Sequence, residues 1–179
     1  MQVLVTGGVR SGKSRHAEGL VLAAAAGGPA TYVAPGATEV EDPDPDWAAR
    51  VAAHRARRPS VWQTVETRDL VDALTRGAGP VLVDCLGTWL TGVLDQEAAW
   101  DRPSPALATL LDERVDAVVA ALSGTDRDVV LVSNEVGLGV VPAHRSGRVF
   151  RDLLGTLNQR VGAVCDQVHL VVAGRVLVL

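Results

Sequence analysis

The chain has 179 residues, of which 47% are hydrophobic, which is enough for one well-buried domain and short for two. Its net charge of −4 argues against nucleic acid as a partner, because nucleic-acid binding usually leaves a basic footprint. Its longest apolar stretch is too short to span a bilayer and its start lacks the basic segment of a signal peptide, so we expect neither membrane insertion nor secretion.

The chain opens with an apolar strand at residues 2–6 that runs into the pattern G-x-x-x-x-G-K-S, a Walker A phosphate-binding loop. Glycine lets backbone N–H groups turn inward around phosphate oxygens, at the start of a helix that we predict over residues 13–26. Lys13 is expected to reach the β and γ phosphates, and the Ser14 hydroxyl to ligate Mg²⁺. The predicted nucleotide-binding residues of the loop are Gly7, Gly8, Val9, Arg10, Ser11, Gly12, Lys13 and Ser14. A glycine-rich turn that binds nothing is the alternative, but the flanking strand and helix favour nucleotide binding.

Strand and helix signals alternate along the rest of the chain. We predict strands at residues 30–34, 61–65, 81–83, 129–133 and 168–173, the last turning at 174–175 into a short final strand. We predict helices at residues 47–57 with Asp46 as N-cap, at 68–76, 86–94 and 107–124, and from an N-cap at Ser146 to residue 164. This alternation predicts an α/β fold of the P-loop NTPase type, with a mostly parallel sheet flanked by helices and a C-terminal β-hairpin. We expect one nucleotide-binding catalytic domain over residues 1–179.

The two cysteines, Cys85 and Cys165, lie far apart, each in or beside an apolar run. This spacing argues against a disulfide framework or a zinc site. Both are interpreted as small core residues, and we expect the protein in a reducing cytoplasm.

Acidic side chains follow three of the predicted strands, at the sheet edge where α/β proteins bind ligands. Asp84 ends the apolar run 81–83 and is typical of a Walker B acid that holds Mg²⁺ opposite Ser14; capping of the next helix is its alternative role. Glu135 is a candidate to orient or deprotonate an attacking hydroxyl, or else to fix the glycine-rich loop after it. Glu66 is a candidate acceptor for ribose hydroxyls, although an exposed acid is the simpler interpretation.

Residues 47–59 gather arginines in an otherwise acidic chain. The cluster consists of Arg50, Arg55, Arg57 and Arg58. Planar guanidinium groups with several donors match phosphate, and a solvated basic face is the alternative. His54 shares a helical stripe with Trp47 and Val51, at spacings of four and three. A neutral imidazole here can attack a phosphorus atom while guanidinium groups stabilise the developing charge; a half-buried structural histidine is the alternative.

Motifs outside the Walker A loop form an ordered set with it. The set consists of residues 6–15, R-V-x-x-H-x-x-x-R-P at 50–59, V-D-C-L at 83–86 with Trp89-Leu90, and S-N-E-V-G-L-G-V-V-P at 133–142. Together these segments resemble the bifunctional adenosylcobinamide kinase and adenosylcobinamide-phosphate guanylyltransferase family of cobalamin biosynthesis. Shorter matches at 150–152, 157–159 and 171–174 extend the resemblance over nearly the whole chain. Many families share the Walker A loop, whereas the ordered set is specific.

The resemblance implies two reactions. In the first, the γ-phosphoryl group of ATP or GTP passes to the aminopropanol hydroxyl of adenosylcobinamide. In the second, a histidine attacks the α-phosphorus of GTP, releases pyrophosphate, and passes GMP to the new phosphate, giving adenosylcobinamide-GDP. By resemblance this nucleophile is His54.

The resemblance also implies the rest of the nucleotide site and the partners. The further nucleotide-binding residues are Ala34, Pro35, Gly36, Arg55, Ala56, Arg57, Arg58, Glu66 and Asp84, and Mg²⁺ would be held by Ser14 and Asp84. The substrate would be a corrinoid. The protein would be a homo-oligomer, by resemblance a trimer, in which neighbouring subunits can contribute residues to one site.

Two other functions stay open on the residues alone. A single-activity P-loop kinase needs Lys13, Ser14 and an acid, and gives His54 no covalent role. A nucleotide-binding module that switches a partner binds nucleotide with no acceptor turnover. Turnover of cobinamide as acceptor distinguishes the three functions.

Overall fold

The computed structural model describes residues 1–38 and 40–179, without the side chain of Arg50. The strands are β1 (Gln2–Gly7), β2 (Thr31–Ala34), β3 (Gln63–Glu66), β4 (Val81–Asp84), β5 (Val129–Val132), β6 (Gln167–Val172) and β7 (Arg175–Val178). The helices are α1 (Lys13–Ala25), α2 (Pro45–Ala56), α3 (Leu70–Thr75), α4 (Leu86–Gln96), α5 (Ser104–Gly124) and α6 (Arg145–Gly162). Within these ranges, no helix combines the length and apolar character needed to cross a membrane. Cys85 and Cys165 are both free and half-buried.

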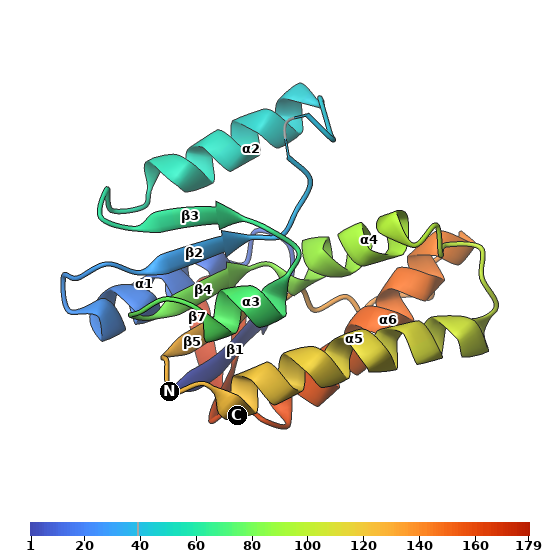
Figure 1. Cartoon of the computed structure of the whole chain (residues 1–179). Coiled ribbons are helices and arrows are strands. Elements are labelled where there is room, and N and C mark those ends of the chain that lie inside the picture. The colour runs from blue at the N-terminus through green and yellow to red at the C-terminus, as the bar shows by residue number, and fades with distance from the viewer. Residues whose placement is uncertain (39) are drawn as a thin grey trace.

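The strands form one sheet in the order β3-β2-β4-β5-β1-β6-β7 (Figure 1). β1 lies between β5 and β6 and is parallel to both, while β7 is antiparallel to β6. The predicted fold, a mostly parallel α/β sheet with a C-terminal β-hairpin, is therefore confirmed. Because parallel strands share one direction, their carboxyl ends meet at one edge of the sheet. That edge carries Gly7 of β1, Ala34 of β2, Glu66 of β3 and Asp84 of β4.

Helices cover both faces of the sheet because side chains alternate across each strand. Val3 and Val5 of β1 pack with Ala17 and Val21 of α1 on one face. Leu4, between the two valines, packs into a larger core on the other face, under α3, α4, α5 and α6. The strands are therefore continuous apolar runs in the sequence, because alternate residues pack into the two cores on opposite faces of the sheet.

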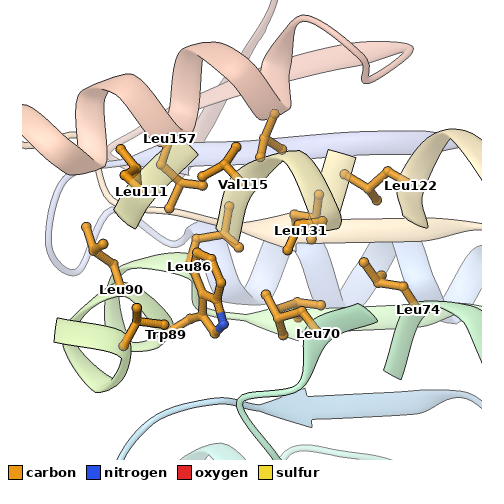
Figure 2. Packing of buried hydrophobic residues seen from close by; sticks show 14 of the residues in the cluster. Leu70, Leu74, Leu86, Trp89, Leu90, Leu111, Val115, Leu122, Leu131 and Leu157 are labelled. Atoms are coloured by element: carbon orange, nitrogen blue, oxygen red, sulfur yellow. The ribbon is translucent and has the colours of Figure 1, made fainter. Parts of the chain in front are cut away.

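The larger core is built mainly from leucines. Figure 2 shows Leu70 and Leu74 of α3, Leu86 and Leu90 of α4, Leu111 and Leu122 of α5, and Leu157 of α6 around Leu131 of β5. Interdigitated packing of this kind has little freedom to shift, since small displacements open voids. It fixes the carboxyl ends of β4 and β5 relative to α4 and α6, which form part of the site below.

The N-cap predicted for α2 is wrong by two residues. The side chain of Asp44, not Asp46, accepts the capping hydrogen bond, from Asp46 N at 3.0 Å. Pro45 explains the shift: it occupies the first helical position, where its missing N–H costs nothing, and it keeps the residue before it extended, as an N-cap requires.

The N-cap predicted for α6 is also wrong. His144 takes that position without a side-chain capping bond, and Ser146 lies inside the first turn. Arg148 closes the preceding loop instead, because its guanidinium donates to the carbonyls of Pro142 and Ala143 at 3.0 and 2.6 Å. The chain therefore enters the helix before Ser146 is reached.

Arg127, just before β5, binds the connection between α3 and β4. Its guanidinium donates to the carbonyls of Ala73 at 3.1 Å and Gly79 at 2.8 Å, and also to that of Arg76. A further bond reaches Thr31 Oγ1 at 3.2 Å. Burial lowers the pKa of this guanidinium. Its charge is stabilised by carbonyl dipoles at the end of α3, where a cation is favoured.

Replacing Arg127 with lysine is expected to lower the free energy of unfolding by about 2 kcal/mol, because a single ammonium group cannot reach carbonyls arranged around a planar fork. Urea unfolding followed by circular dichroism measures the change. The matched control is Arg114→Lys, which alters an exposed pair with Glu97 at 2.7 Å and should cost under about 0.5 kcal/mol. Equal losses in the two variants would contradict the role given to Arg127.

Candidate functional site

The phosphate-binding loop joins β1 to α1. Gly12 caps α1 with a φ of 97°, a left-handed conformation that favours glycine. Lys13 is buried, and its ammonium donates to the carbonyl of Gly8 at 3.1 Å across the loop. The Ser11 hydroxyl is buried and has no hydrogen-bond partner among the described residues. A phosphate oxygen would satisfy it, since buried polar groups in folded proteins are nearly always paired.

Two segments from late in the chain brace this loop. The carbonyl of Ser11 accepts from Gly174 N at 2.8 Å in the β6–β7 turn, and the carbonyl of Gly7 accepts from Glu135 N at 3.0 Å after β5. The carboxylate of Glu135 accepts from Gly137 N at 2.7 Å, so this side chain fixes its own loop, one of the two roles considered for it. Hydrogen bonds within the protein therefore hold the loop in this conformation.

A cavity lies between this loop and α2, and we call it the phosphate-loop cavity. The loop supplies Arg10, Ser11, Gly12, Lys13, Ser14 and Arg15, and the α2 side supplies Asp42, Asp44, Asp46, Trp47, Ala49, Ala53, His54 and Arg57. Cations and inward N–H groups at a helix N-terminus make the loop side attractive to anions.

Trp47, Val51 and His54 lie on one face of α2 and line a second cavity, which confirms the predicted stripe. The indole of Trp47 donates to the carbonyl of Ala37 at 2.9 Å. Gly36 lets the ring approach, because a Cβ there would lie 3.1 Å from Trp47 Cζ2. These contacts anchor α2 to the segment that follows β2.

The second cavity has a volume of about 310 Å³, and we call it the apolar cavity. Residues of β2, β3 and the segment after β2 form one side: Ala34, Gly36, Ala37, Thr38 and Glu66. Residues of α4, α6 and the segment after β5 form the other: Thr88, Thr91, Asn134, Val136 and Phe150. His54 and Trp47 line both cavities, so the imidazole stands at the boundary between the phosphate loop and the apolar cavity.

Asp84, at the carboxyl end of β4, is a buried charge beside this boundary. The Tyr32 hydroxyl donates to Asp84 Oδ2 at 3.0 Å, and Nδ1 of His54 lies 3.6 Å from the same oxygen. Burial acts to raise the pKa of Asp84, but the His54 imidazole and hydrogen bonds from Ser14 and Tyr32 hold it below its ordinary value. The carboxylate is therefore ionised at neutral pH.

This carboxylate orients His54. The separation of 3.6 Å is longer than a hydrogen bond, so the attraction is electrostatic, and it favours a proton on Nδ1. In the neutral imidazole, Nε2 then carries the lone pair. An imidazole with a free lone pair beside a phosphate-binding loop can act as a nucleophile toward phosphorus.

Ser14 and Asp84 fit the protein's share of a magnesium site. The Ser14 hydroxyl is close enough to the carboxylate to lower the pKa of Asp84, so the two possible oxygen ligands lie near each other. Across the part of the chain that the structure describes, no group of three or more His, Cys, Asp or Glu side chains could hold a metal ion. An ion here would take its other ligands from water and phosphate, as Mg²⁺ usually does.

Of the four arginines predicted to face phosphate, Arg57 lines the phosphate-loop cavity. Its guanidinium donates to both carboxylate oxygens of Glu18 on α1, at 3.0 and 3.3 Å, and this pairing raises the pKa of Arg57. Because Glu18 is buried, the pair ties the end of α2 to α1. The side chain of Arg50 lies outside the described part of the structure.

Arg55 and Arg58 are not among the residues that line the two cavities. Arg55 pairs with Glu66 at 2.9 Å, while the Glu66 side chain also lines the apolar cavity. Arg58 lies over the ring of Tyr32, 3.2 Å from its centroid, and donates to Thr64 Oγ1 at 2.9 Å. Nucleotide binding by these two arginines stays a prediction.

The structure brings most of the predicted site residues around two adjoining cavities. Besides Arg55 and Arg58, the predicted residues Gly7, Gly8, Pro35 and Ala56 are not among the lining residues of either one. Sequence reasoning missed Tyr32 and gave Asn134 no role. Tyr32 left a usable signal: it is the one tyrosine of the chain, inside an apolar strand, and a buried tyrosine hydroxyl needs a partner.

One family model and three known proteins match nearly the whole chain. The family model is described as cobinamide kinase / cobinamide phosphate guanyltransferase, and it matches residues 3–179. The chain is 40% identical to the bifunctional adenosylcobalamin biosynthesis protein CobU of Salmonella typhimurium, with 97% of each chain covered. It is 39% identical to CobU of Escherichia coli, again with 97% of each covered. It is 38% identical to CobP of Pseudomonas aeruginosa, over 97% of this chain and 94% of that protein.

Tyr32→Phe is expected to lower the free energy of unfolding at pH 7 by about 1–2 kcal/mol, because it removes a donor from a buried carboxylate. The bond stabilises ionised Asp84, whose folded pKa lies below the ordinary 3.8. The difference in unfolding free energy between wild type and variant should therefore be fully present above pH 3.8. It should shrink as the pH falls through the folded pKa of Asp84. Urea unfolding at several pH values measures it. In an Asp84→Asn background the same substitution should cost less, and an unchanged cost would argue against the contact.

Proposed function

The chain belongs to the cobinamide kinase / cobinamide phosphate guanyltransferase family, and from this premise we propose that one catalytic domain, residues 1–179, performs two successive reactions on a corrinoid. The γ-phosphoryl group of ATP or GTP first passes to the aminopropanol hydroxyl of adenosylcobinamide. GMP from GTP then passes to the new phosphate, which gives adenosylcobinamide-GDP and pyrophosphate. The reactions take place in the cytoplasm, with no nucleic acid partner and no membrane insertion.

The observation that carries the proposal is the position of His54, which lines both cavities. The phosphate loop binds the β and γ phosphates of GTP, and the apolar cavity receives guanosine beside Ala34, Gly36 and Glu66. The α-phosphorus then lies at the boundary between the cavities, next to the imidazole.

Guanylyl transfer runs through His54. Nε2 attacks the α-phosphorus, an N–P bond forms, and the bond to pyrophosphate breaks with its electron pair on the leaving oxygen. The proton on Nδ1 stays in place, and ionised Asp84 stabilises the imidazolium that results. An oxygen of the acceptor phosphate then attacks the same phosphorus, the N–P bond breaks, and the electron pair returns to Nε2.

Phosphoryl transfer uses the same loop. The acceptor hydroxyl oxygen attacks the γ-phosphorus, the bond from that phosphorus to the β–γ bridging oxygen breaks with its electron pair on the departing nucleoside diphosphate, and the hydroxyl proton passes to water. Lys13 and the loop N–H groups stabilise the charge on the transferring group. Ser14 and Asp84 would hold Mg²⁺, which neutralises phosphate charge when bound. Positioning and charge stabilisation account for most of the catalysis in such a transfer.

Incubation with GTP labelled at the α-phosphorus tests the covalent step. Wild-type protein should retain acid-labile label after denaturation, GTP labelled at the γ-phosphorus should leave none, and His54→Ala should retain neither. His54→Ala should also abolish GMP transfer while sparing most phosphoryl transfer to cobinamide. If nucleotide binds and no label is retained, the protein is a plain P-loop kinase; equal loss of both reactions in folded His54→Ala protein would also contradict the role of His54.

Lys13→Ala should lower the rates of both reactions by about 100-fold or more, because both depend on the same phosphate-binding loop. Steady-state assays of phosphoryl and guanylyl transfer measure the two rates on one preparation. Arg114→Ala, a change at an exposed cation on α5 outside both cavities, is the matched control and should leave both near wild type. Loss of only one reaction in Lys13→Ala would show that they do not share the loop.

We further propose that the protein is a homo-oligomer, resembling a trimer, that assembles through β7. This strand is at the edge of the sheet, and its Leu177 and the following Leu179 are 56% and 70% exposed. Leu138 and Val140, in the loop after β5, are 86% and 95% exposed. Exposed apolar edges of this kind are templates for pairing with another chain.

Leu177→Asp should convert the oligomer to monomers, because a charge would then face an apolar contact. Light scattering coupled to size-exclusion chromatography gives the mass directly. Leu22→Asp, at a 46% exposed leucine on α1, is the control and should keep the wild-type mass. A monomeric wild type would refute the assembly, and an unchanged mass in Leu177→Asp would refute this interface.

A further inference from the structure

The apolar cavity straddles β4, and its two sides come from different strands. In the sheet, β4 lies between β2 and β5. Asp84, at the end of β4, therefore lies between the two sides of the cavity. Residues of β2, β3 and the segment after β2 form one side, and residues of α4, α6 and the segment after β5 form the other. His54 lies 3.6 Å from Asp84, so both sides of the cavity meet at the imidazole.

The nucleotide residues proposed above fall on one side only. Ala34, Gly36 and Glu66 belong to the β2 and β3 side, and Glu66 places a carboxylate there. Apart from Asp84 at the boundary, no carboxylate among the described residues lines the other side; its polar side chains are Cys85, Thr88, Thr91 and Asn134. A phosphate with two negative charges is repelled by a carboxylate and favoured by neutral donors, so this second side suits an anionic acceptor.

Asn134 is the side chain on this wall that offers an unused donor. Its Oδ1 lies 3.7 Å from the Sγ–H of Cys85, while no described residue accepts from its Nδ2. The Thr88 hydroxyl already donates to the carbonyl of Cys85 at 2.9 Å, and the Thr91 hydroxyl to that of Gly87 at 3.1 Å. Among the polar side chains of this wall in the described structure, the amide of Asn134 is therefore the one that is free to donate into the cavity.

The protein holds Asn134 in place by its backbone. Its carbonyl accepts from Asn158 Nδ2 at 3.0 Å, and Asn158 Oδ1 in turn accepts from Ser133 Oγ at 2.5 Å. The next residue, Glu135, donates its N–H to Gly7 of the phosphate loop at 3.0 Å. The amide thus has a fixed position relative to the loop, and preorganised donors contribute most to binding and catalysis.

We infer that the wall of Asn134, Thr91 and Phe150 is the acceptor side of the site, where the Asn134 amide donates to the phosphate monoester that receives GMP. The inference rests on the proposed function. It gives the acceptor oxygen a route to the phosphorus on His54 from the side opposite the guanosine: the P–O bond forms, the N–P bond breaks, and the electron pair returns to Nε2. Phe150 supplies apolar contact to the arm that carries the phosphate.

The size of the cavity limits what enters it. About 310 Å³ is at the small end of ligand pockets, and the guanosine takes up one side. The remaining side admits a short phosphorylated arm but not a macrocycle, which stays at the mouth. The acceptor is thus recognised first by its arm and its phosphate.

The test separates the two halves of the transfer. Asn134→Ala and Asn134→Asp are each incubated with α-labelled GTP alone, which measures guanylylation of the enzyme, and the labelled enzyme is then chased with cobinamide phosphate. Guanylylation should stay within about twofold of wild type, while the chase slows by about 10- to 100-fold. Asn134→Asp should slow the chase more than Asn134→Ala, because it adds a like charge. Gln96→Ala, at the exposed far end of α4, is the matched control for both steps.

The outcomes distinguish this inference from the function beneath it. A chase at wild-type speed in both variants overturns the acceptor role of Asn134. Equal slowing of guanylylation and chase also overturns it, since Asn134 would then serve the nucleotide side. Absence of guanylylation in the wild type overturns the proposed transferase function and the acceptor wall with it. As a further readout, phosphoryl transfer to unphosphorylated cobinamide should fall less in Asn134→Asp than the chase does, because that acceptor is uncharged; an equal fall would count against phosphate recognition.

Discussion

The site depends on one buried, ionised carboxylate. Removing Asp84 from water is costly unless donors surround it, and the donors come from three different elements. Tyr32 lies on β2, Ser14 on α1 and His54 on α2, and each contacts the same carboxylate. Satisfying this charge therefore fixes the phosphate loop, the sheet and the arginine-bearing helix relative to one another.

Local sequence patterns made the fold predictable, whereas the site was harder to predict because it depends on contacts between residues far apart in the sequence. Apolar runs, glycines at turns and the Walker A spacing are all patterns of about ten residues or fewer. The helices and strands could therefore be placed from the sequence, although the order of the strands in the sheet could not. The N-cap of α2 lies two residues before the predicted one because Pro45 takes the first helical position, a signal that the sequence does contain. No such signal marks the start of α6, where His144 precedes the helix without a side-chain capping bond. Tyr32 and Asp84 meet across 52 positions, and no local pattern encodes that pairing.

The arginine cluster illustrates how composition can mislead about contacts. Sequence reasoning treated its members as a group aimed at phosphate. In the structure Arg57 pairs with Glu18, Arg55 with Glu66, and Arg58 lies over an aromatic ring. A guanidinium can exchange a carboxylate for a phosphate, so pairing does not remove it from the site. Pairing does mean that nucleotide has to compete with an existing partner, which makes binding weaker than a free cationic patch would give.

The hydrogen bond between Gly174 N and the carbonyl of Ser11 joins the phosphate loop to the turn between β6 and β7, far apart in the sequence. β1 likewise lies between β5 and β6, which come from the final third of the sequence. Contacts so distant along the chain form late, since the intervening segment must first be ordered. The phosphate loop therefore gains this bond only after β6 and β7 have joined the sheet. Until then the Walker A sequence is present, but the loop lacks one of the contacts that hold its anion-binding shape.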